Sequence, residues 1–275
     1  MNEVLANGLT MHVEELWPPD ERSRPQGTAV LIHGIAPDNL ASWYLTLAYP
    51  LAQSGMRVLL YDLRGHGRSE QSAHGYRFPQ LLDDLDALMT HWDVSEPVYL
   101  MGNSFGGALA FGYAARYPER VAGVVAIEAE VPTPGYFSRL SRVADGLTVV
   151  SDHGRAAVRR PTGLVHAPRV LALVTETSIR EELPAGPPPA ADRLAAIDCP
   201  VLCLYGGESS VRLRSPAIRR LLPQTRTIVF AGQRHTLLTD HHHEVGECVL
   251  GWLAQLRGSG FRDQDGYSTA GTRDA

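Results

Sequence analysis

The sequence of 275 residues predicts an α/β fold built on a mainly parallel sheet. Short, continuous apolar runs alternate with helix-like stretches, and continuous apolar strands are typical of a sheet that is covered on both faces. An Asn-Gly pair lies between two alternating segments in residues 3–16 and predicts a β-hairpin before the parallel part. Six further strands are predicted, at residues 28–34, 56–63, 97–104, 121–129, 200–207 and 226–232, which makes eight in all.

Helix-like stretches separate these strands and are expected to flank the sheet. They cover residues 42–55, 78–92, 107–120, 215–224 and 242–256. The alternation stops at about residue 131 and resumes at about residue 198. An insertion of that length is usually functional, so we expect a small helical lid there. Its expected helices lie near 136–147, 152–160 and 167–182.

These boundaries divide the chain into three parts. We expect a core domain formed by residues 1–130 and 199–257, with residues 131–198 as the lid inserted into it. The end of the chain, residues 258–275, is polar and rich in glycine, which predicts a disordered tail.

Composition argues against several classes of partner. The net charge of −5 does not favour nucleic acid. No apolar run is long enough to span a membrane, and the acidic N-terminus does not look like a signal peptide, so we expect a cytoplasmic protein without a membrane partner. The three cysteines, Cys199, Cys203 and Cys248, are expected to be reduced thiols that serve packing.

One serine stands at a predicted strand-to-helix turn. Gly102-Asn103-Ser104-Phe105-Gly106 fits the pattern G-x-S-x-G, with a strand before it and a helix after it. Glycines are needed because the turn brings the strand and helix backbones close together. The turn would raise the Ser104 hydroxyl at a helix N-terminus, where free N–H groups favour an anion. The backbone N–H groups of Phe105 and of Ile35, in the loop after the first parallel strand, are the candidate oxyanion-hole donors.

Four motifs in order give this chain a resemblance to the α/β-hydrolase fold superfamily. They are LIHG at 31–34, YDLRGHGRS at 61–69, GNSFGG at 102–107 and GQRH at 232–235. The resemblance covers most of residues 25–257 except the lid. It implies a catalytic triad with Ser104 as nucleophile and with the base in the loop after the last strand, where His235 lies.

The third member of such a triad is a carboxylate, and here the sequence departs from the superfamily. Most members carry an aspartate at the position that Ser209 occupies in this chain. Glu128, at the end of strand 121–129, is the preferred acid, since a subgroup of haloalkane dehalogenases carries its acid after the corresponding strand. Glu208 is the alternative acid, and a Ser104–His235 dyad without an acid stays open as well.

A serine nucleophile favours acyl-enzyme chemistry over dehalogenation or epoxide opening, which the superfamily performs with aspartate. We therefore expect a serine hydrolase of carboxylic esters or thioesters, acting on a small-molecule substrate with an apolar acyl group of small to moderate size. The alternatives are a carbon–carbon bond hydrolase, whose GNSFGG-like motif is similar, an acyltransferase or cyclase of a biosynthetic pathway, and a non-catalytic binding protein. No metal or organic cofactor is implied, and the sequence leaves the oligomeric state open.

Overall fold

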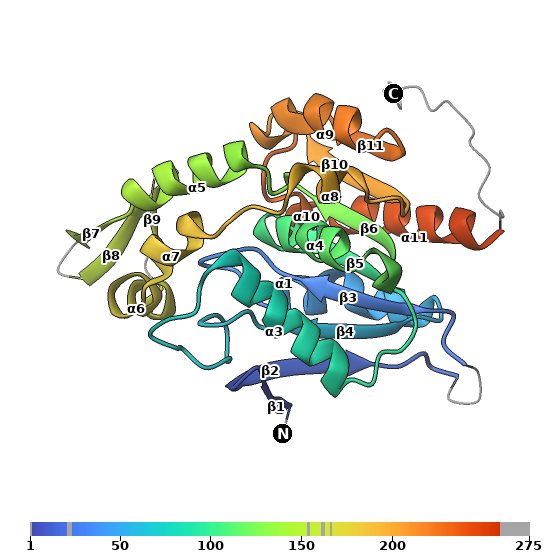
Figure 1. The fold of residues 1–275 in the computed structure, drawn as a ribbon, viewed down its shortest axis with the longest axis horizontal. Coiled ribbons are helices and arrows are strands. Elements are labelled where there is room, and N and C mark those ends of the chain that lie inside the picture. Colours follow the sequence, from blue (N-terminus) through green and yellow to red (C-terminus); the bar gives the residue numbers. More distant parts are fainter. Residues whose placement is uncertain (1, 21–23, 153–154, 161–162, 166, 259–275) are drawn as a thin grey trace, which may run out of the picture.

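One eight-stranded sheet runs through the molecule, in the order β1-β2-β4-β3-β5-β6-β10-β11 (Figure 1). The computed structural model describes residues 2–20, 24–152, 155–160, 163–165 and 167–258, so nearly all of the expected tail lies outside the described residues. The strands are β1 (Glu3–Ala6), β2 (Leu9–Leu16), β3 (Thr28–Ile32), β4 (Arg57–Tyr61), β5 (Val98–Asn103), β6 (Val121–Ile127), β10 (Val201–Gly206) and β11 (Thr225–Phe230).

The predicted hairpin and the predicted parallel strands are both confirmed. Strands β1 and β2 pair antiparallel with Ala6 opposite Leu9, and the two turn residues Asn7 and Gly8 have φ of 48° and 76°. Positive φ at both central positions is what a type I′ turn requires, and Asn-Gly adopts it readily. Strand β2 runs antiparallel to β4. The other strands of this sheet, β4, β3, β5, β6, β10 and β11, are parallel to one another.

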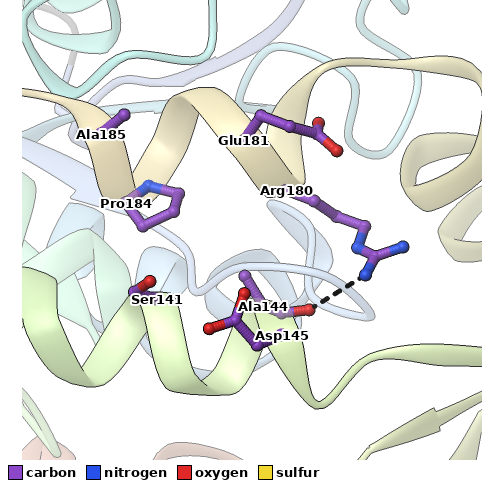
Figure 2. A pocket seen from close by; sticks show the side chains of 7 residues that line it. All are labelled: Ser141, Ala144, Asp145, Arg180, Glu181, Pro184 and Ala185. Carbon is purple, nitrogen blue, oxygen red and sulfur yellow. Dashed lines mark hydrogen bonds between the residues drawn. The ribbon is translucent and has the colours of Figure 1, made fainter.

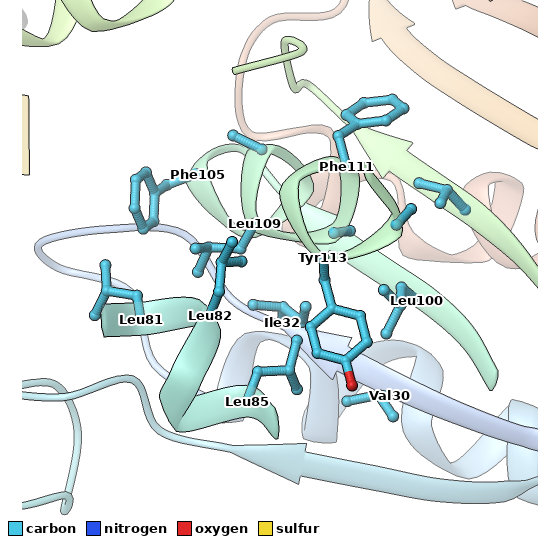
Figure 3. Close-up of a cluster of buried hydrophobic side chains, with 14 of the residues drawn as sticks. Val30, Ile32, Leu81, Leu82, Leu85, Leu100, Phe105, Leu109, Phe111 and Tyr113 are labelled. Carbon is cyan, nitrogen blue, oxygen red and sulfur yellow. The ribbon is translucent and has the colours of Figure 1, made fainter. Parts of the chain in front are cut away.

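Helices cover both faces of the sheet, because the buried strands present apolar side chains alternately to each side. Val30 and Ile32 of β3 face the helices α3 and α4 (Figure 3), whereas Leu31 packs with Trp43 and Trp252 on the other face. The helices of the core are α1 (Ala41–Trp43), the π-helical η1 (Tyr44–Ala48), α2 (Tyr49–Gln53), α3 (Phe78–His91), α4 (Phe105–Arg116), the 3₁₀ turns η2 (Pro118–Arg120) and η3 (Val211–Arg214), α9 (Ser215–Leu221), α10 (Leu237–Asp240) and α11 (His242–Gly258).

The segment between β6 and β10 contains strands as well as helices. Its elements are α5 (Pro134–Asp145), β7 (Thr148–Asp152), β8 (Arg155–Arg160), β9 (Gly163–Val165), α6 (Pro168–Glu176), α7 (Ile179–Ala185) and α8 (Ala191–Ala195). The helix expected near 152–160 is wrong, because β8 pairs there with β7 and β9 in a small antiparallel sheet. Val158 of β8 is buried against Val170 and Val174 of α6, and this tertiary packing outweighs the helix propensity of the Ala- and Arg-rich stretch.

This segment is fastened to the core on two sides. The carboxylate of Glu182 in α7 accepts hydrogen bonds from the backbone amides of Gly75 and Tyr76, at 2.7 and 2.6 Å. In α5, the ring of Phe137 lies edge-on to that of Phe78 with centroids 5.2 Å apart. Tyr136 and Phe137 are therefore used in packing. Among the described residues, no helix has the length and apolarity that crossing a bilayer would require.

Candidate active site

Ser104 stands at the sharp turn between β5 and α4. It has φ of 52° and ψ of −114°, a conformation that non-glycine residues rarely adopt, while its N–H still donates to the carbonyl of Ile127 at 2.8 Å. A Cβ at position 102 would overlap the backbone of Gly106, and a Cβ at position 106 would overlap the carbonyl oxygen of Ile32. Glycine at these two positions is what allows strand and helix to approach so closely.

The structure brings Ser104, His235 and Glu128 together, although the first two are 131 positions apart in the sequence. Nε2 of His235 lies 3.0 Å from Oγ of Ser104, and Nδ1 lies 3.0 Å from Oε2 of Glu128. A carboxylate only accepts, so Nδ1 carries the ring proton and Nε2 is free to accept the serine hydroxyl. This arrangement can take a proton from Ser104 and stabilise the imidazolium that results.

Glu128 is held below the imidazole by the neighbouring strand. Its φ of 52° ends β6 and turns the side chain towards the end of β10, where only 1% of the residue is exposed. Oε1 accepts from the backbone N–H of Gly206, and Oε2 accepts from the hydroxyl of Ser209. A buried carboxylate needs such donors, because burial without them would be costly.

The alternative acid is not brought to the imidazole. The carboxylate of Glu208 faces solvent, where Oε2 accepts from Nε of Arg234 at 3.3 Å between two exposed side chains. Glu130 pairs with Arg139 of α5. Of the three carboxylates near these strand ends, Glu128 alone contacts His235.

The loop after β3 presents the first of the two candidate oxyanion donors. The N–H of Gly34 donates to Oδ2 of Asp38 at 2.6 Å, and that of Ala36 donates to Nε2 of His66 at 3.0 Å. Among the residues that the structure describes, no acceptor is present for the N–H of Ile35 between them or for that of Phe105, the first residue of α4. These two amides stay available to an anion, as an oxyanion hole requires.

Two buried histidines brace this loop. Nε2 of His33 accepts from the N–H of Leu63 at 2.9 Å, and Nδ1 of His66 donates to the carbonyl of Arg64 at 2.8 Å. Burial lowers the pKa of His33, against the opposing effect of Asp38 and Asp62. Burial, aided by the nearby His33, lowers the pKa of His66 to about 3. Both rings are therefore neutral near pH 7 and can accept from backbone amides.

Because the pKa of His66 falls from 6.5 to about 3 on folding, acid should destabilise the protein through this ring. The unfolded chain binds a proton there that the folded chain does not. The contribution of His66 to the free energy of unfolding is therefore fully present above pH 6.5 and is lost as the pH falls towards 3. One such proton contributes a slope of up to about 1.4 kcal/mol per pH unit. The free energy of unfolding, measured with urea at pH values between 4 and 7, should change less steeply with pH in His66→Gln, which keeps an acceptor but cannot titrate. Equal slopes would contradict this.

A hollow of about 270 Å³ lies elsewhere, between α5 and α7 (Figure 2). Arg180 at its edge donates to the carbonyl of Ala144 at 3.4 Å. Its lining consists of Ser141, Ala144, Asp145, Arg180, Glu181, Pro184 and Ala185, and includes neither Ser104 nor His235.

Comparison with known proteins identifies the fold. A family model described as the alpha/beta hydrolase fold matches residues 29–150. The structure resembles a thermophilic esterase from Thermogutta terrifontis with a TM-score of 0.68 and 20% identity, covering 92% of this chain and 98% of the esterase. It also resembles a haloalkane dehalogenase from Bradyrhizobium elkani, with a TM-score of 0.67, 22% identity, and coverage of 93% and 98%. The chain has the α/β-hydrolase fold.

Curated relatives of this chain differ in activity. An epoxide hydrolase B of Mycobacterium tuberculosis is 32% identical over 130 residues, which are 46% of this chain and 34% of that protein. A monoacylglycerol lipase of Mycolicibacterium smegmatis is 32% identical over 117 residues, or 41% and 40% of the two chains. The chain thus spans about a third to two fifths of the length of these relatives, so its own activity has to be argued from its site.

Two contacts of the site cannot be predicted from the sequence. The sequence shows that Ser209 stands in place of an aspartate, but not that its hydroxyl contacts Glu128. His66 lies within the YDLRGHGRS motif, but nothing in that motif indicates which amide its ring accepts from. Both contacts depend on which loops lie side by side at the end of the sheet.

Proposed function

We propose that this chain is a serine hydrolase of carboxylic esters or thioesters. Its nucleophile is Ser104, its base is His235 and its orienting acid is Glu128. The observation that carries the proposal is the continuous hydrogen-bonded path from the Ser104 hydroxyl through the imidazole to the buried carboxylate, with both nitrogen–oxygen distances 3.0 Å. The esterase-like fold and the free amides of Ile35 and Phe105 support it.

The reaction has two steps. Oγ of Ser104 attacks the acyl carbon while its proton moves to Nε2 of His235, and the amides of Ile35 and Phe105 hold the oxyanion. The imidazolium then donates that proton to the leaving alkoxide or thiolate. Water attacks the acyl-enzyme, His235 takes the water proton, and the carboxylic acid is released as Ser104 regains its hydrogen.

Hydrolysis is favoured over acyl transfer or cyclisation by the openness of the site. The His235 side chain is 52% exposed, so water has access to the acyl-enzyme at the position from which the base would activate it.

Residues 131–198 are proposed as a lid inserted into a core of residues 1–130 and 199–257. The proposed small-molecule substrate carries an apolar acyl group of small to moderate size, and the apolar composition of that segment supports this.

Labelling with a fluorophosphonate tests the nucleophile. We expect the probe to modify Ser104, as located by peptide mass mapping, because it reports a serine activated by a neighbouring base. Ser104→Ala should not be labelled. p-Nitrophenyl and N-acetylcysteamine acyl esters should then be hydrolysed. A chain that is neither labelled nor active on either ester would be a binding protein, whereas turnover that depends on an added alcohol or amine acceptor would indicate transfer.

A further inference from the structure

The hydroxyl of Ser209 contacts the same oxygen of Glu128 that faces His235. Oε2 of Glu128 accepts from Oγ of Ser209 and lies 3.0 Å from Nδ1 of the imidazole. Ser209 is only 7% exposed, so water does not compete freely for this contact. The hydroxyl is thus separated from the imidazole by a single carboxylate oxygen.

The direction of the Ser209 hydrogen bond follows from its second contact. Oγ of Ser209 also accepts from the backbone N–H of Val211 at 3.3 Å. A hydroxyl has one hydrogen and two lone pairs, so the hydrogen is available for the carboxylate. The hydroxyl is an uncharged donor, so it leaves the negative charge of Glu128 to act on His235. Because the glutamate side chain has three rotatable bonds, a second anchor besides the Gly206 amide limits its rotation.

We propose that Ser209 is a positioning residue that fixes the Glu128 carboxylate for His235. This inference rests on the proposed function. Strands β6 and β10 are neighbours in the sheet, so the residue after one and the loop after the other meet at the same point below the imidazole.

The test removes the hydroxyl of Ser209. Ser209→Ala should lower kcat on a p-nitrophenyl ester about tenfold and slow the labelling of Ser104 to the same extent, with KM unchanged within about twofold, because a hydrogen bond to a charged group is lost at a site remote from the substrate. Ser209→Thr keeps a hydroxyl and should recover most of the activity. Ser210→Ala, at the exposed neighbouring position, is the matched control and should behave like the wild type.

Full activity and full-rate labelling of Ser104 in Ser209→Ala would overturn the inference. The outcomes also distinguish failure of this inference from failure of the proposed function. If the wild type itself is not labelled at Ser104 and has no turnover, the proposed function and this inference are both refuted. If it is labelled and active while Ser209→Ala is unaffected, only the inference is.

Discussion

Replacing Glu128 with glutamine is expected to lower kcat by about 10⁴-fold while the fold stays intact. The amide has the shape of the carboxylate but different hydrogen bonding. Its oxygen should stay where the Gly206 amide donates, which places the NH₂ group against Nδ1 of His235. Nδ1 would then have to accept, so Nε2 would carry the ring proton and could not take one from Ser104.

The measurement is kcat on a p-nitrophenyl ester together with the thermal midpoint of unfolding. Glu208→Gln is the control, because Glu208 has the same chemistry and follows the neighbouring strand β10 but pairs with Arg234 in solvent. An exposed ion pair contributes little, so this variant should keep kcat within about twofold of the wild type and leave the thermal midpoint unchanged. The assignment of the acid is refuted if Glu208→Gln suffers the large loss and Glu128→Gln does not.

The β-strand framework could be predicted from local sequence because each part of it follows from short-range rules. The Asn7-Gly8 turn determines the register of the first hairpin, and the buried parallel strands stand out as apolar runs between helices. The strand β8 could not be predicted from local sequence, because it depends on tertiary contacts. Its residues form helices readily, and only their pairing with Thr148–Asp152 and the burial of Val158 make them a strand.

The candidate site was predictable where the chain order alone determines it. Ser104 follows a strand and opens a helix, and His235 follows the last strand, so both could be placed from sequence. Glu128 could be proposed because residues at the carboxyl ends of parallel strands gather at one edge. The Ser209 contact could not, because it depends on β6 and β10 being direct neighbours although 73 residues lie between Ile127 and Val201.

A methyl group at position 106 is expected to damage both stability and activity. The Cβ of Gly106→Ala would overlap the carbonyl oxygen of Ile32 and press on that of His33, and neither can rotate away because both belong to the backbone. The free energy of unfolding should fall by about 3 kcal/mol, the cost of forcing extra volume into a well-packed interior. If α4 instead moves away from β3, the amides of Phe105 and Ile35 separate, and a displacement of about 1 Å is enough to lower kcat about 100-fold.

Gly251→Ala in α11 makes the same chemical change where there is room for it. An added Cβ there meets no atom within 4 Å, and the position is exposed and helical. Alanine should therefore raise the free energy of unfolding by about 0.5–1 kcal/mol, since it loses less conformational freedom than glycine in a helix. Urea unfolding and the rate of Ser104 labelling compare the two variants directly. Equal shifts in stability for both would mean that the tight approach of α4 to β3 does not limit position 106, and the steric account of the turn around Ser104 would have to be abandoned.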